Sequence, residues 1–162
     1  MGVFYYNNDK NNEIKAGGIL FYFKDKDNIK FLMSTYKNNT LSDFGGRIDK
    51  TDKSIQETIA REVEEETNGI YRQNYVLEKI KDLKPYYSPT RKYMVYLVEL
   101  DEDINIKLFG DWEFSDGIER FVYWIPGQKI INKKFLKNKL SQRLLIKPLI
   151  EDIFKLVKNY VK

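Results

Sequence analysis

The clearest pattern of apolar and polar positions lies in the last part of the chain. After Ser141, apolar side chains recur every four residues, at Leu145, Leu149, Ile153, Val157 and Val161. This spacing places them on one face of a helix. It predicts a C-terminal amphipathic helix, with Pro148 either near its start or kinking it.

A second helical pattern begins at Ser54. The sequence Ser54-Ile55-Gln56-Glu57 fits a capping box, in which Ser accepts a hydrogen bond from the third amide and Glu reaches back to the start. Ile59 and Val63 are four residues apart and supply an apolar stripe. Asn68-Gly69 ends the helix, because both residues tolerate the left-handed conformation of a C-terminal cap.

The rest of the apolar pattern is strand-like. Aromatic and β-branched residues are concentrated in five segments, which are 17–23, 30–36, 76–83, 93–100 and 121–125. The polar turn at 24–28 makes the first two a hairpin, and residues 84–91 are a loop with two prolines. The order of strands, helix, strands and helix predicts an α/β (α+β) sandwich, a mixed sheet flanked by helices. With 162 residues and no visible linker, we expect one domain over residues 1–162.

Composition narrows the chemistry. The chain contains no Cys and no His, which excludes disulfides, catalytic triads that use these residues, and an ordinary zinc site. A metal ion must then have oxygen ligands, which points to Mg²⁺ or Mn²⁺. A general base must be a carboxylate, Lys or Tyr.

The net charge of +4 mildly favours polyanionic partners. The alternative is that the excess Lys and Arg side chains only form a solvated surface. No apolar run approaches the roughly 20 residues that span a membrane, and no signal peptide opens the chain. The sequence predicts a cytoplasmic protein without membrane contact.

Four carboxylates fall within residues 62–66, near the end of the second predicted helix. The negative end of the helix dipole disfavours anions there, by about 0.3–1 kcal/mol each. Glu62, Glu65 and Glu66 are spaced by three and four residues, so they share one face beside the apolar stripe. We interpret them as oxygen ligands for Mg²⁺, with Gly45-Gly46 bringing backbone close and Arg61 bracing one carboxylate. The alternative is a solvated acidic helix end.

The same segment resembles the Nudix box. That pattern runs Gly, five residues, Glu, seven residues, then Arg-Glu-aliphatic-any-Glu-Glu-any-Gly-aliphatic. Residues 61–67, Arg-Glu-Val-Glu-Glu-Glu-Thr, match its core, and Gly46 followed by Asp52 matches its opening with Asp in place of Glu. One extra residue separates Asp52 from Arg61, and Asn68 occupies the glycine position. The segments 15–23 and 121–126 also look like the opening strand of the family and its late strand, which has a Trp before the last helix.

The resemblance implies a metal-dependent hydrolase that cleaves a diphosphate linked to another moiety, usually a nucleoside. It assigns Mg²⁺ binding to Glu62, Glu65 and Glu66, with the Gly45 carbonyl as a further ligand. Arg61 would orient Glu62. The catalytic base varies in this family: in some members it is a glutamate of the helix, here Glu62 or Glu65, and in others a glutamate on a distant loop. The candidate on a distant loop is Glu119, with Glu113 behind it.

Substrate contacts are predicted from cations beside the glycine pair and beside the proline loop. Arg47 is the first choice for a phosphate, with Lys50 and Lys53 next to it. Arg91 and Tyr87 suit a bound phosphate and a stacked base, although Tyr near a strand is usually core packing. Trp112 is a similar candidate.

The substrate expected from this resemblance is a nucleotide, a nucleotide sugar or a dinucleoside polyphosphate. The alternatives are removal of the mRNA cap, with RNA as partner, and a Nudix module that binds nucleotide or RNA without turnover. Members of the family often form homodimers, so a homodimer is a further expectation.

Overall fold

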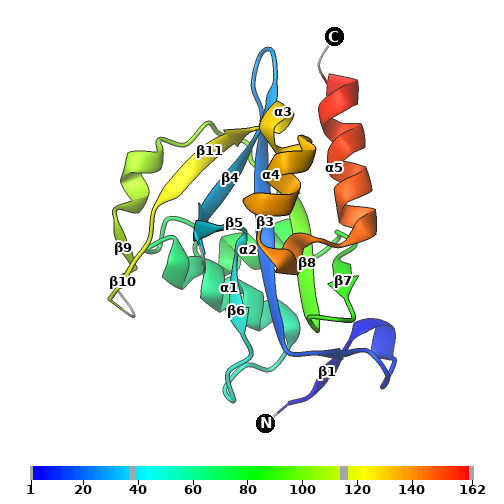
Figure 1. Cartoon of the computed structure of the whole chain (residues 1–162). Coiled ribbons are helices and arrows are strands. Elements are labelled where there is room, and N and C mark those ends of the chain that lie inside the picture. The colour runs from blue at the N-terminus through cyan, green and yellow to red at the C-terminus, as the bar shows by residue number, and fades with distance from the viewer. Residues whose placement is uncertain (1, 37–38, 114–116, 161–162) are drawn as a thin grey trace.

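The structure is a computed structural model that describes residues 2–36, 39–113 and 117–160. At its centre is a seven-stranded mixed sheet with the order β11-β4-β3-β8-β7, in which β5 also pairs with β4 and β6 with β3 (Figure 1). The parallel pair is β3 with β8, and the other pairs are antiparallel. The strands are β3 (Ala16–Lys24), β4 (Ile29–Thr35), β5 (Leu41–Ser42), β6 (Phe44–Arg47), β7 (Tyr86–Ser88), β8 (Tyr93–Glu99) and β11 (Val122–Pro126).

Both faces of the sheet are covered by helices. Alternate residues of β3 enter two separate cores, with Ile19 and Phe21 in one and Leu20 in the other. The helices α1 (Ile55–Glu66) and α2 (Gln73–Ile80) cover the first face. The helices α3 (Gly127–Ile130), α4 (Lys133–Asn138) and α5 (Lys147–Tyr160) lie on the second (Figure 1). The predicted α/β sandwich is confirmed.

The two predicted helices exist, with small differences at their ends. In α1 the Ser54 hydroxyl accepts the Glu57 amide, while the Glu57 carboxylate reaches Lys53 rather than Ser54. Asn68 and Gly69, with φ of 50° and 80°, end this helix as expected. The C-terminal helix α5 begins only at Lys147, after the 3-10 turn η4 (Gln142–Leu144). Pro148 therefore lies in the first helical turn, where its missing N–H costs no hydrogen bond.

The prediction of a strand over residues 76–83 is wrong, because this segment lies largely within α2. Val76 and Ile80 are four residues apart and buried in the same core as α1. Packing of this one face decides the conformation over the β-propensity of Val and Ile. The predicted loop at 84–91 also contains β7, whose Tyr86 pairs with Val95 of β8.

Two small hairpins and two further 3-10 turns complete the described chain. They are β1 (Phe4–Tyr5) with β2 (Glu13–Ile14), β9 (Trp112–Glu113) with β10 (Ile118–Glu119), η1 (Tyr6–Asn8) and η3 (Ile106–Phe109). Within the described residues, each helix is too short or too polar to cross a membrane.

Candidate active site

Glycines on two neighbouring strands let the acidic helix approach the sheet. Gly17 pairs with Gly46 and Gly18 with Gly45, across β3 and β6. A Cβ atom on Gly46 would lie 2.3 Å from the Cδ atom of Glu62, closer than any real contact. The Glu62 carboxylate therefore occupies the space that a side chain at residue 46 would fill.

Arg61 is fixed by the acidic residues around it. Its Nε and Nη2 atoms donate to both carboxylate oxygens of Asp52, at 3.1 and 2.9 Å, and Nη2 also donates to the Arg47 carbonyl. Its Nη1 atom donates to Glu62 at 3.0 Å and to Glu65 at 3.5 Å. All of its N–H groups thus have acceptors. The predicted bracing of Glu62 by Arg61 is present.

Asp52 acts as the anchor for Arg61. Its carboxylate also accepts hydrogen bonds from the Asp49 amide and the Thr58 hydroxyl. Burial alone would raise the pKa of Asp52, but the hydrogen bonds from Arg61, Asp49 and Thr58 lower it. The extra residue before Arg61 therefore does not separate Asp52 from the helix.

Glu66 is the most deeply buried of the three helix carboxylates Glu62, Glu65 and Glu66. Its Oε1 atom accepts the Gly45 amide at 2.9 Å, and its Oε2 atom lies 3.1 Å from Nη2 of Arg120. The same Nη2 atom lies 2.9 Å from the carboxylate of Glu113, which is also buried. Among the described side chains, the Nε atom of Arg120 is buried without a hydrogen-bond partner.

Burial shapes the acid–base properties of these residues. It raises the pKa of Glu66 to about 8, although Arg120, Arg143 and the Gly45 amide oppose the shift. Burial also raises the pKa of Glu62, against the effect of Arg61, and the nearby charges of Glu65 and Glu113 raise it further. Both carboxylates are therefore more basic than a carboxylate in water.

A second buried network stands beside the carboxylates and is centred on Arg143. Its Nε atom donates to Asp43 at 2.8 Å and to the Ser42 hydroxyl at 3.0 Å. Its guanidinium carbon lies 4.4 and 4.7 Å from the ring centroids of Tyr36 and Tyr93. The Tyr93 hydroxyl donates to the other Asp43 oxygen at 2.5 Å.

This network also depends on glycine. A Cβ atom on Gly18 or on Gly45 would lie 2.3 Å from the Tyr93 hydroxyl. Burial alone would lower the pKa of Arg143, but Asp43 and the surrounding groups raise it, so the guanidinium stays charged. The result is a fixed cation at the wall of the site.

Carboxylates of the acidic group and the guanidinium groups of Arg120 and Arg143 line one cleft of about 760 Å³. Its acidic residues are Glu62, Glu66 and Glu113. Its cations are Arg47, Arg91, Arg120 and Arg143. The remaining lining includes Tyr36, Gly45, Gly46, Tyr93, Ile118 and Gln142. A cleft with carboxylates against one wall and arginines around them suits a substrate with several phosphates.

Several predicted site residues thus come together. Glu62, Glu66, Gly45, Arg47 and Arg91 line the cleft. Glu65 lies on the same helix and is held by Arg61. The Gly45 contact seen is the amide to Glu66, so a role for its carbonyl stays a prediction.

Three predicted residues lie elsewhere in the described structure. Glu119 is exposed and pairs with Trp112 across the β9–β10 hairpin, whereas Glu113 faces the cleft with Ile118. Tyr87 stacks on Tyr6 at 4.8 Å and donates to the Glu13 carbonyl, so it packs the N-terminal hairpin instead of the cleft. Trp112 is half exposed and is likewise not part of the cleft lining.

Sequence reasoning missed Arg120, Arg143 and Asp43. Arg143 and Asp43 are 100 residues apart in sequence, and Arg120 also contacts Glu66 of a distant helix. The available signal was the pair Gly17-Gly18 inside a strand, because glycine there indicates a close approach.

The described residues contain no group of three or more acidic side chains close enough to hold one metal ion. Arginines lie between the carboxylates instead, with Arg61 against Glu62 and Glu65, and Arg120 against Glu66 and Glu113. The predicted binding of one Mg²⁺ ion by Glu62, Glu65 and Glu66 therefore stays a prediction, and it would require these side chains to move together and away from Arg61 and Arg120. The donors are nevertheless hard oxygens, and burial, with smaller contributions from the charges of Glu65 and Glu113, raises the pKa of Glu62.

The fold and the helix-borne carboxylates define a class of hydrolases. The chain matches the NUDIX domain family over residues 16–145. The chain therefore belongs to the Nudix family and is a hydrolase acting on pyrophosphate bonds.

Solved structures share this fold at low sequence identity. The NUDIX domain of Shewanella oneidensis NrtR, complexed with ADP ribose, is 15% identical with a TM-score of 0.51, over 88% of this chain and 86% of that one. An Ap4A hydrolase from C. elegans is 16% identical with a TM-score of 0.48, over 88% of this chain and 96% of that one. Comparison with curated proteins gives no match.

Proposed function

We propose that the protein is a Mg²⁺-dependent pyrophosphohydrolase that cleaves a nucleoside diphosphate linked to another moiety. The observation that carries this proposal is the shared cleft. It holds three buried or half-buried glutamates at one wall and four arginines around them. The glutamates suit a cation and a water nucleophile, and the arginines suit the phosphates of the substrate.

The carboxylates divide into two roles. Glu65, Glu66 and Glu113 are the candidates to hold the metal ion, and their side chains would have to move closer together to share it. When bound, the ion would supply Lewis-acid stabilisation of charge on the phosphates. The contacts of these glutamates with Arg61 and Arg120 would be replaced in part by contacts with the ion. Mn²⁺ has the same preference for oxygen and is an alternative ion.

Glu62 is our candidate for the general base. Arg61 fixes one of its oxygens, and the carboxylate lines the cleft. Its raised pKa favours acceptance of a proton from the attacking water. Glu119 does not line the cleft, whereas Glu113 of the same hairpin does, so Glu113 replaces Glu119 among the candidate site carboxylates.

The arginines would bind the substrate. Arg143 is the most firmly held, since Asp43 and Ser42 orient it and two tyrosine rings flank it. Arg47 and Arg91 line the same cleft and would neutralise further phosphate oxygens. Tyr36 and Ile118 offer apolar surface for a base or sugar at the cleft wall.

The test is incubation with Mg²⁺ and a panel of diphosphate substrates, with products identified by mass. The panel contains ADP-ribose, dinucleoside polyphosphates, nucleoside triphosphates, nucleotide sugars and capped RNA. We expect cleavage of a phosphoanhydride in at least one member, lost in Glu65→Gln and retained in Glu57→Gln. Glu57 is a matched control, because it lies on the same helix and caps its first turn. Absence of turnover across the panel, with the protein folded, would contradict the proposal.

A further inference from the structure

Positive charge is concentrated in one continuous part of the chain. Residues 120–150 contain eight Lys and Arg and no Asp or Glu. The other 131 residues contain 20 Lys and Arg against 24 Asp and Glu, so the chain's net charge of +4 hides two regions of opposite sign. This basic segment includes Arg120 and Arg143 of the cleft, and its lysines continue onto α3 and α4.

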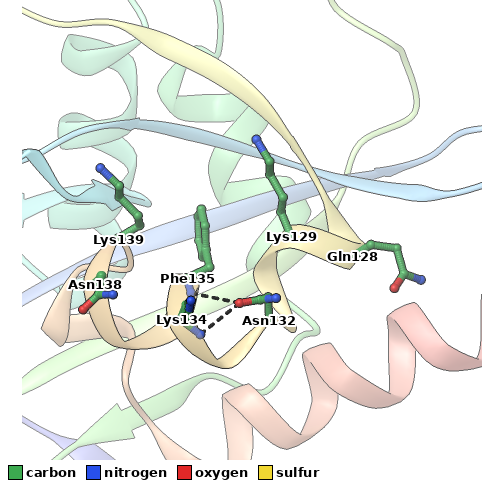
Figure 2. Close-up of a pocket in the computed structure, with 7 residues that line it drawn as sticks. All are labelled: Gln128, Lys129, Asn132, Lys134, Phe135, Asn138 and Lys139. Atoms are coloured by element: carbon green, nitrogen blue, oxygen red, sulfur yellow. Dashed lines mark hydrogen bonds between the residues drawn. The ribbon is translucent and has the colours of Figure 1, made fainter.

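The lysines surround a second hollow of about 480 Å³ on α3 and α4, here called the lysine pocket. It is lined by Gln128, Lys129, Asn132, Lys134, Phe135, Asn138 and Lys139 (Figure 2). The side chains of Lys129 and Lys139 project on either side of the Phe135 ring, which points in the same direction (Figure 2). The lining thus contains three cations, three amides and one aromatic ring, without a carboxylate. The Asn132 oxygen accepts the backbone amides of Lys134 and Phe135, and the Gln128 side chain points away from the ring (Figure 2).

The lysine pocket adjoins the cleft through the backbone. The Lys139 carbonyl accepts the Leu41 amide at 2.7 Å, and the Leu41 carbonyl accepts the Ser141 amide at 2.9 Å. Thr40, Ser141 and Gln142 line the cleft, whereas Lys139 lines the lysine pocket. The two hollows are therefore neighbours along residues 139–141.

We propose that the lysine pocket binds a nucleotide of a single-stranded nucleic acid whose 5′ diphosphate lies in the cleft. The strand phosphates would contact the lysines, and a base would lie against Phe135 with its polar edge toward the amides. The geometry favours a nucleic acid over an acidic peptide, because the aromatic ring and amides match a base as well as a charge. This inference deepens the proposed function and relies on it for the position of the 5′ end.

The test measures binding without hydrolysis. A fluorescent 12-nucleotide RNA with a 5′-hydroxyl has no diphosphate to cleave, so its affinity reports the strand contacts alone. Lys129, Lys134 and Lys139 are changed together to Ala. A matched triple variant changes Lys10, Lys84 and Lys155, which are exposed and lie outside both hollows.

We expect at least a tenfold loss of RNA affinity in the pocket variant and little change in the matched variant. In the pocket variant the steepness of the decrease of log K with log salt concentration should fall by about 2. Three lysine contacts are lost, and each phosphate contact on a single strand contributes about 0.7. Phe135→Leu should lower affinity about fivefold or more without changing this steepness, because it removes stacking but no charge.

Equal losses in the two triple variants would overturn the proposal, because they would show a diffuse charge effect. Unchanged affinity in the pocket variant, or displacement of the RNA by a glutamate peptide of equal charge, would also overturn it. Hydrolysis of a small nucleotide substrate is followed in parallel. The pocket variant should retain it, so loss of strand binding and failure of the proposed hydrolase are distinguishable.

Discussion

Replacing Gly46 by Ala tests how the sheet positions the catalytic helix. The new Cβ atom would lie 2.3–2.6 Å from the three atoms of the Glu62 carboxylate group. Carbon atoms at optimal contact are about 3.5–4.0 Å apart, so this carboxylate must withdraw by about 1 Å. A misplacement of that size costs roughly 100-fold in rate, equivalent to about 2.7 kcal/mol of transition-state stabilisation.

The fold should tolerate the same change. The Glu62 carboxylate ends a flexible side chain, and Ala restricts the unfolded chain, which stabilises by about 0.4–1 kcal/mol where it fits. We therefore expect a nearly unchanged melting temperature and a kcat/KM about 100-fold lower, measured on the best substrate of the panel at fixed Mg²⁺.

Gly69→Ala is the matched control for this experiment. Gly69 has φ of 80° with open space around it, so Ala there strains the helix end without touching the carboxylates. It should lose about 1 kcal/mol of stability and keep its activity. The reasoning would be refuted by a kcat/KM of Gly46→Ala within threefold of the wild-type value. It would also be refuted if Gly69→Ala lost as much activity as Gly46→Ala.

Three further predictions follow from the buried charges. Asp43→Asn leaves the buried Arg143 without its anion, so urea unfolding should show a free energy of unfolding lower by about 3 kcal/mol or more. Arg143→Lys keeps the charge but not the guanidinium, so it should chiefly raise KM in steady-state kinetics. The pKa of Glu66 is raised from 4.5 to about 8, so its contribution to the stability of the metal-free protein is complete below pH 4.5 and disappears as the pH rises through 8. Urea unfolding with a chelator at pH 5, 7 and 9 should show this loss of stability, and Glu66→Gln should make stability depend less on pH. A wild-type stability that rises from pH 5 to pH 9 would contradict the raised pKa of Glu66. Mg²⁺ at 100 times its Kd should stabilise the wild type by about 2.7 kcal/mol in thermal unfolding, and Glu65→Gln should abolish the shift; equal shifts in both would show that the ion binds elsewhere.

The local parts of this site could be predicted from the sequence. The capping residue, the apolar stripe and the spacing of Glu62, Glu65 and Glu66 lie within one helix, where spacing alone fixes which residues share a face. The contacts of Arg61 with Glu62 and Glu65 are similarly local. Periodicity therefore sufficed for α1 and its acidic end.

The remainder depends on tertiary contacts that one sequence does not reveal. Arg120 meets Glu66, and Arg143 meets Asp43, only after the sheet has formed. The choice between Glu113 and Glu119 is set by the register of a short hairpin, which turns the two side chains to opposite faces. The apolar residues of 76–83 have strand propensity and so predict a strand, whereas packing against α1 makes most of this segment helical.

The most direct test of the account is the initial rate of diphosphate hydrolysis as a function of Mg²⁺ concentration, for the wild type, Glu62→Gln and Glu57→Gln. We expect the initial rate to rise with Mg²⁺ concentration and to saturate in the wild type and in Glu57→Gln. In Glu62→Gln we expect a rate lower by at least 100-fold at every Mg²⁺ concentration, because the proton acceptor is lost. Hydrolysis that is independent of added metal in the presence of a chelator, or that survives in Glu62→Gln, would contradict the central claim.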